Sequence, residues 1–148
     1  GYTLRPIKKS DIGIIKPLWE KLNALHLEKS RHFKDHYRRF SFEKRCEEFH
    51  GIEESLIRIE IALDGDIPAG YCVTTVKRGA GEIDSLYVEE SLRGQGLGGR
   101  LVENSLRWIK EHRCEEIVIA VAEGNETAFE FYRKFGFYPR ITLLRMKE

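Results

Sequence analysis

The chain has 148 residues, of which 41% are hydrophobic and 33% charged, and this size and composition fit one domain over residues 1–148. The formal net charge of +1 excludes the strong basic bias of a dedicated nucleic-acid binder, and no apolar run reaches the roughly 18 residues of a membrane-spanning helix. The three cysteines form no CxxC pair, so we expect neither a disulfide framework nor a zinc site. Because the N-terminus also lacks a signal-peptide pattern, we expect a reducing, cytoplasmic location.

The N-terminal third predicts a short strand and two helices. Residues 2–5 read as a strand, and apolar side chains then recur at largely helical spacing over residues 15–27. Pro17 lies inside this pattern, so the regular helix either starts near it or kinks there. Residues 30–40 are polar and aromatic without a clear period, and residues 42–50 read as a second short helix.

Three segments rich in β-branched residues follow, at 56–63, 69–77 and 82–88. The Asp64-Gly65-Asp66 segment between the first two is a hairpin signal. Arg78-Gly79-Ala80-Gly81 makes the next turn. We therefore expect an antiparallel meander of three strands.

The C-terminal part alternates helices and strands. An amphipathic helix is expected over residues 101–109, and the apolar run 117–122 reads as a strand covered on both faces. Asn125 can cap a further helix that ends at Gly136, a natural residue for that position. Residues 137–146 then supply a final strand or strand pair. The predicted fold class is α/β (α+β), with a mixed, mostly antiparallel sheet of six to seven strands, helices on both faces and the order βααβββαβαβ(β).

The turn after residue 88 contains four glycines within six residues, 94–99. Such a run would disrupt a helix interior, but at a strand-to-helix turn it lets the backbone approach a ligand closely. The free N–H groups of the first helical turn then point at an anion. The turn therefore predicts a phosphate-binding site.

Several phosphate motifs compete for this turn. A Walker A loop needs Gly-Lys-Ser/Thr, which is absent. A dinucleotide-binding GxGxxG pattern is matched by Gly94, Gly96 and Gly99, and Glu123 lies near the ribose-binding spacing. Residues 89–93 separate the strand from the first glycine, however, and only about 25 residues remain after Glu123, which is too few for a doubly wound sheet. The dinucleotide interpretation is therefore disfavoured.

A third pattern, R/Q-x-x-G-x-G/A, is met by Arg93, Gly96 and Gly98. Together with the strand at 82–88 and the helical segment 125–137, in this order and spacing, the sequence resembles the Gcn5-related N-acetyltransferase (GNAT) superfamily. The resemblance is close over residues 82–137 and extends elsewhere in element order. It implies a GNAT-type fold and an acetyl-CoA-dependent N-acetyltransferase, which moves an acetyl group to a primary amine of a small molecule or protein by direct attack in a ternary complex.

The resemblance also implies how coenzyme A is held. The pantetheine arm would lie between two parallel strands that splay apart, 82–88 and 117–122, and pair with their free backbone groups. The N–H of Val88 or a neighbour could polarise the acetyl carbonyl. The residues expected to bind the cofactor are Leu86, Tyr87, Val88, Arg93, Gly94, Gln95, Gly96, Leu97, Gly98, Gly99, Arg100, Asn125, Ala128, Phe131 and Tyr132.

Two carboxylates and one tyrosine are candidates for catalysis. Glu82 matches the glutamate that some family members use as general base, and Asp84 suits binding of the substrate cation. Strand alternation is expected to place both on one face, along with Leu86 and Val88. A solvated acid at the strand's start is the alternative for Glu82. Tyr132 matches the tyrosine that protonates the thiolate, and a core aromatic is its alternative.

The acceptor side carries weaker signals. Trp19 and His26 could line an acceptor pocket, as the N-terminal helices often do in the family, or could simply pack a helix on the sheet. Glu28, His32 and His36 recur every four residues without an HExxH pattern, so no metal is expected. The sequence does not indicate which amine is acetylated. A homodimer through the C-terminal strand and a non-catalytic acyl-CoA-binding or regulatory module on the same fold stay open.

Overall fold

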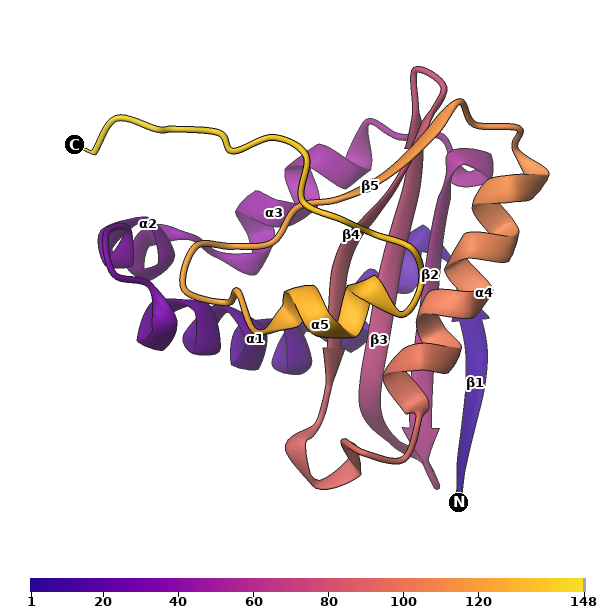
Figure 1. Cartoon of the computed structure of the whole chain (residues 1–148). Coiled ribbons are helices and arrows are strands. Elements are labelled where there is room, and N and C mark those ends of the chain that lie inside the picture. Colours follow the sequence, from indigo (N-terminus) through magenta and orange to yellow (C-terminus); the bar gives the residue numbers. More distant parts are fainter. Residues whose placement is uncertain (148) are drawn as a thin grey trace.

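A computed structural model describes residues 1–147, and a five-stranded sheet runs through its centre (Figure 1). The strands are β1 (Tyr2–Ile7), β2 (Ile57–Asp64), β3 (Ile67–Lys77), β4 (Ala80–Val88) and β5 (Glu116–Ile119). The helices are α1 (Lys16–Lys29), α2 (Lys34–Arg39), α3 (Phe42–His50), α4 (Leu97–Glu111) and α5 (Ala128–Arg133), with 3₁₀ segments at Lys9–Ile15, Glu54–Leu56 and Glu90–Leu92. The strands lie in the order 1-2-3-4-5, and only the β4–β5 pair is parallel among those described.

The predicted meander is confirmed. β2, β3 and β4 pair antiparallel in succession. The turn between β3 and β4 has positive φ values at Arg78 (52°) and Gly79 (79°), as in a hairpin turn whose twist matches the strands. Gly65, in the turn between β2 and β3, also has a positive φ of 63°. The turn residues of both hairpins thus set the strand register.

Helices cover both faces of the sheet, as predicted. Buried residues of α1 and α3 pack with β2 and β3 in one cluster that includes Leu18 and Phe49. Residues of α4, among them Leu97 and Leu101, pack with β3 and β4 in a second cluster, and α5 contributes half-buried aromatic rings to it. The α1–α3 face and the α4–α5 face are therefore distinct sides of one sheet.

The first helix begins at the proline rather than kinking around it. Pro17 lies in the first two positions of α1, where its missing N–H has no intrahelical partner to lose. The segment without clear periodicity contains the six-residue helix α2, which the sequence did not predict. Within residues 1–147, no helix is long and apolar enough to cross a membrane.

Two predictions about the end of the sheet are wrong. Residues 137–146 form no strand, so the sheet has five described strands instead of six or seven, and the apolar side chains of Leu144 and Met146 are 89% and 91% exposed. The segment runs away from the body in Figure 1. The run 117–122 is not a strand covered on both faces either: β5 ends at Ile119, and Val118 is 37% exposed. β5 is an edge strand of the described sheet, because it pairs only with β4.

A bulge in β4 overturns part of the predicted alternation of its side chains: Glu82, opposite Thr75, and Asp84, bonded to Thr75, share a face, but Leu86 and Val88 lie on the other face. The register of β3 and β4 pairs Val73 with Ser85 and then Thr74 with Ile83, which leaves Asp84 as an extra residue. An extra residue reverses the alternation beyond it. Ile83, Leu86 and Val88 therefore pack on the α4–α5 face, whereas the Asp84 carboxylate lies on the other side near α3.

Candidate active site

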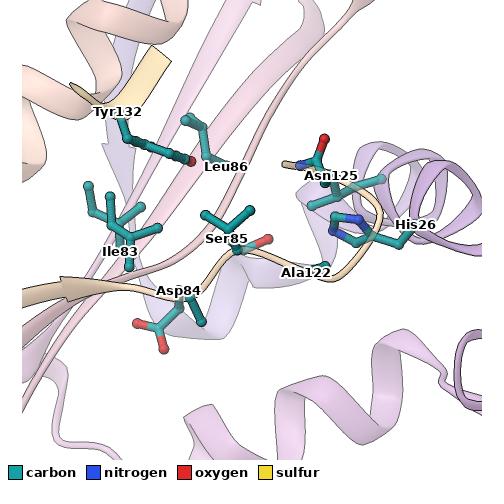
Figure 2. Close-up of a pocket in the computed structure, with 12 residues that line it drawn as sticks. His26, Ile83, Asp84, Ser85, Leu86, Ala122, Asn125 and Tyr132 are labelled. Carbon is teal, nitrogen blue, oxygen red and sulfur yellow. The ribbon is translucent and has the colours of Figure 1, made fainter. Parts of the chain in front are cut away.

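The candidate site lies where β4 and β5 stop pairing. Their parallel ladder ends at the Ile83–Ile119 pair, and the two chains then separate around a cavity of about 110 Å³ (Figure 2). Residues 83–86 line one side of this cavity and residues 119–122 the other. The gap falls between the two segments, 82–88 and 117–122, that were expected to splay apart.

Four further side chains complete the cavity wall, namely Leu22, His26, Asn125 and Tyr132. Tyr132 comes from α5, which packs on the α4–α5 face. His26 comes from α1, which packs on the opposite face. Figure 2 shows these two side chains on opposite sides of Ser85 and Leu86. The cavity therefore lies in the plane of the sheet, and elements from both faces border it.

The glycine-rich turn leads from β4 into α4. Gly94 and Gly96 have φ values of 86° and 77°. Residues with a side chain rarely adopt such values, so these positions favour glycine. Gly96 is the N-cap residue of α4, and no side chain caps this helix end. The first backbone N–H groups of a helix have no intrahelical partner, and the helix dipole adds positive charge there. This end of α4 can therefore receive a phosphate group.

The other two glycines bring α4 close to α5. A Cβ atom at Gly98 would lie 3.4 Å from Cζ of Phe131, and one at Gly99 would lie 3.5 Å from Cζ of Phe135. These are ordinary contact distances, so both positions have room for a side chain. Within this turn, glycine is required by the backbone only at Gly94 and Gly96, where φ is positive. Leu97, which lies between Gly96 and Gly98, is a buried core residue, so it can offer a ligand only its backbone N–H.

Two arginines lie beside the turn and contact aromatic rings. The Nε of Arg93 donates to the carbonyl of the last β4 residue at 3.0 Å, and its guanidinium lies 5.4 Å from the centre of the Tyr87 ring. The guanidinium of Arg100 lies 5.5 Å from the centre of the Tyr2 ring. The Tyr2 hydroxyl also donates to the carbonyl of Gln95 at 3.5 Å. Arg93 therefore ties the turn to β4 while both guanidinium groups keep positive charge near it.

Tyr132 presents its hydroxyl to the cavity (Figure 2). Its ring packs against Phe131 and Phe137, with centroids 5.1 Å and 6.2 Å away, and within residues 1–147 its hydroxyl has no hydrogen-bond partner. Burial raises the pKa of Tyr132, so the hydroxyl keeps its proton at neutral pH. Helix α5 ends at Arg133, so the predicted end at Gly136 is three residues too late. In the turn that follows, Gly136 has φ at 90°, and the N–H of Phe137 donates to the Tyr132 carbonyl at 3.2 Å. This helix end holds the tyrosine in place.

The two predicted carboxylates lie outside the centre of the cavity. Asp84 reaches its wall, but its carboxylate accepts a hydrogen bond from Thr75 Oγ1 at 2.6 Å and lies 3.8 Å from both Arg45 and Lys77. Its side chain is 2% exposed, and burial raises its pKa to about 6. Glu82 is half-buried in the paired part of β4, opposite Thr75, and is not among the lining residues.

Of the two predicted acceptor-side residues, only His26 reaches the cavity. Trp19 is a core residue that packs against Phe40 and Phe42 at 5.5 Å and 5.7 Å, and it borders a separate groove between α1 and α2. The ring of His26 lies 5.5 Å from that of Tyr37. Its Nδ1 is buried and, within residues 1–147, has no hydrogen-bond partner. A buried polar atom without a hydrogen bond lowers the free energy of unfolding by about 1–3 kcal/mol.

A loop between β5 and α5 fastens α1 to the cavity. Glu123 accepts hydrogen bonds from Ser30 Oγ at 2.7 Å and from the N–H groups of Arg31 and His32 at 2.8 Å and 3.3 Å. These bonds lower its pKa to about 2. Glu126 adds an ion pair with Arg31. The sequence indicated Glu123 only as a candidate ribose ligand. It did not predict these hydrogen bonds, because their donors lie more than 90 residues away along the chain and leave no local signal.

Neighbouring residues tighten the same contact. A Cβ atom at Gly124 would lie 2.2 Å from the carbonyl oxygen of Lys29, so only glycine fits this close approach. Asn125 accepts a hydrogen bond from Lys29 Nζ at 3.3 Å. The N-cap residue of α5 is Thr127, so the prediction that Asn125 caps this helix is wrong. Its side chain instead connects the cavity wall to α1.

The fold and the cavity define an α+β protein with a binding gap in its sheet, beside a glycine-rich helix start. The chain matches the Acetyltransferase (GNAT) family over residues 19–137 and therefore belongs to that family. Among residues 1–147, no three or more His, Cys, Asp or Glu side chains are grouped to hold a metal ion.

Individual relatives agree with this assignment. The chain is similar to N-alpha-acetyltransferase 30 of Schizosaccharomyces pombe, with 38% identity over 82 residues, which cover 52% of this chain and 55% of the relative. It thus spans about half the length of that curated relative. The solved structure of a putative acetyl transferase from Pyrococcus furiosus has a TM-score of 0.74 at 21% identity, with full coverage of both chains. The aminoglycoside N-acetyltransferase AAC(6')-Iy, solved with CoA, has a TM-score of 0.70 at 15% identity, covering 100% of this chain and 95% of the other. Both show the same fold.

Proposed function

We propose that the protein is an acetyl-CoA-dependent N-acetyltransferase that acts on a primary amine. One observation carries the proposal: a gap between parallel strands lies next to an uncapped helix start that follows two left-handed glycines. An extended arm fits the gap, and a phosphate fits the helix start. Family membership over residues 19–137 supports the same reaction class.

The residues present fit this cosubstrate. The N–H groups at the start of α4, with Arg93 and Arg100 nearby, would hold its phosphates. Beyond Ile83, the edge of β4 that no longer pairs with β5, near Leu86, would hold the amide-bearing arm. Acetyl-CoA supplies an activated acyl carbonyl, and the chain supplies orientation, exclusion of water and proton transfer.

Tyr132 would protonate the departing thiolate. Its hydroxyl faces the cavity, has no competing partner in the described part of the chain and stays protonated at neutral pH. The cavity has a volume of about 110 Å³. That volume suits an acyl group and an amine better than a whole acceptor, so the rest of the acceptor would lie outside.

A turnover assay tests this function. The chain is incubated with acetyl-CoA and a panel of amines, namely polyamines, an aminoglycoside, lysine peptides and peptides with a free N-terminus, and released thiol is measured. We expect thiol release with at least one amine and measurable binding of acetyl-CoA by calorimetry. Binding without thiol release across the panel would instead favour a non-catalytic acyl-CoA-binding module. Absence of binding would overturn the proposal.

A further inference from the structure

His26 lines the cavity on the side opposite Tyr132. It lies on α1, the helix of the α1–α3 face, while Tyr132 lies on α5 across the sheet. Figure 2 shows its ring beside Ala122 and Asn125, at the end of the cavity away from the tyrosine. If the thiol leaves on the Tyr132 side, the amine would approach from the His26 side.

The imidazole has a hydrogen-bonding group that the protein leaves unused. Nδ1 is buried without a partner in residues 1–147, whereas most buried polar atoms in native structures have one. The ring touches Tyr37 on α2 but forms no hydrogen bond with it among the described contacts. Because Nδ1 is covered, an arriving ligand would reach the ring through Nε2, which is not among the buried unpartnered atoms.

The surroundings keep the imidazole neutral. Burial lowers the pKa of His26, and the nearby charge of Lys29 lowers it further. The other titratable groups around it are Asp84 of β4, Glu123 of the β5–α5 loop, Tyr37 of α2 and Tyr132 of α5. Asp84 accepts a hydrogen bond from Thr75, and Glu123 accepts hydrogen bonds from the Ser30 hydroxyl and from the N–H groups of residues 31 and 32. Neither carboxylate is therefore paired with the imidazole.

We propose that His26 is a catalytic residue that accepts the proton of the attacking amine nitrogen; this role rests on the proposed acetyl transfer. The ammonium loses its first proton to solvent as it enters the gap, because removal from water disfavours the charged form. The neutral nitrogen then forms the C–N bond, and its remaining N–H becomes acidic enough for an imidazole to remove. The C–S bond breaks with its electron pair on sulfur, which takes the Tyr132 proton. Solvent returns the His26 proton to Tyr132, so protons and charge balance.

This assignment competes with the carboxylates predicted from the sequence. Asp84 points its carboxylate at Thr75, Arg45 and Lys77. Glu82 is absent from the cavity wall. Among the residues described, His26 lines the cavity on the acceptor side, and one of its ring nitrogens has no hydrogen-bond partner.

The test compares His26→Gln with two controls in the full chain. His32→Gln changes an exposed histidine that uses only its backbone N–H in the described contacts, and Glu82→Gln removes the competing base. For each, kcat is measured from pH 5 to 9 with acetyl-CoA and the best amine of the panel, and calorimetry gives the acetyl-CoA Kd. We expect His26→Gln to lower kcat about 100-fold, to remove the rise in kcat with pH below about 6.5, and to keep Kd within about twofold.

Each result has one interpretation. A His26→Gln variant that keeps wild-type kcat and the wild-type pH profile would overturn the role of His26, as would loss of the rising limb in Glu82→Gln alone. If His26→Gln does not fold, the dependence of the wild-type kcat on pH tests the proposal instead. The absence of a rise in kcat with pH near or below pH 6.5 would also overturn the role of His26. No thiol release from the wild type with any amine would overturn the proposed function itself.

Discussion

Replacing Gly96 with aspartate should separate ligand binding from folding. A Cβ atom at this position meets nothing within 4 Å, so the structural cost is the left-handed backbone, with φ at 77°. That strain is about 1–2 kcal/mol for a residue with a side chain. A carboxylate beside the positive end of the helix dipole recovers about 0.5–1 kcal/mol. The net loss of about 1 kcal/mol corresponds to a Tm decrease of about 2–6 °C.

The effect on acetyl-CoA should be much larger. The new carboxylate would lie where the phosphates of the cosubstrate are proposed to bind, and it would also compete for the N–H groups at the start of α4. Two like charges about 5 Å apart repel by about 1–3 kcal/mol, depending on the local dielectric. Acetyl-CoA should therefore bind roughly 5- to 150-fold more weakly, as calorimetry can measure.

Two matched variants isolate the charge. Gly96→Asn has the same shape and backbone strain without the charge, and should bind acetyl-CoA within a few-fold of wild type. Gly65→Asp places the same change at another open, left-handed position, with φ at 63°, in the β2–β3 turn. It should lower Tm similarly without affecting affinity. A folded Gly96→Asp variant that binds acetyl-CoA within twofold of wild type would refute the phosphate site.

Three further substitutions test other parts of the site. Tyr132→Phe removes a hydroxyl without a described partner, so thiol release should slow about 100-fold with little change in Tm, and the exposed Tyr138→Phe serves as control. Glu123→Gln removes a carboxylate that accepts three hydrogen bonds and should cost about 2 kcal/mol at pH 7 in urea unfolding. Because its pKa falls from 4.5 to about 2 in the fold, the wild type should lose this advantage as pH drops from about 4.5 to 2; a constant difference there would contradict the reasoning. Asp84 has the opposite sign: its pKa rises from 3.8 to about 6, so its contribution is lost as pH rises through 6. Between pH 4 and pH 8, the free energy of unfolding of Asp84→Asn should therefore rise by about 2 kcal/mol relative to that of the wild type. Parallel curves of stability against pH for the two proteins would contradict this prediction.

The sequence predicted those elements whose signals are local. Asp-Gly and Arg-Gly turns marked the two hairpins, because each needs a positive φ that glycine adopts easily. The glycine-rich turn was readable for the same reason. Pro17 marked the start of α1 because a proline fits the first helical turn.

The features missed by sequence reasoning depend on distant partners. The bulge at Asp84 has no glycine or proline to announce it, and only the register with β3 reveals it. Helix α2 has six residues, too few to show a period. The apolar pattern of residues 137–146 predicted a strand, but a strand forms only where a neighbour supplies its hydrogen bonds, and no such neighbour lies beside it in residues 1–147.

The bulge explains why the gap opens where it does. Ile83 is the last β4 residue paired with β5, and the extra residue Asp84 follows it directly. A bulge bends its strand, increases the local twist and commonly ends pairing. Beyond it, Leu86 turns toward the α4–α5 face, and Ser85 turns toward the α1–α3 face, where it bonds Tyr71 at 2.7 Å. One inserted residue thus frees the backbone that would hold the cosubstrate and opens the space through which Tyr132 and His26 face each other across the sheet.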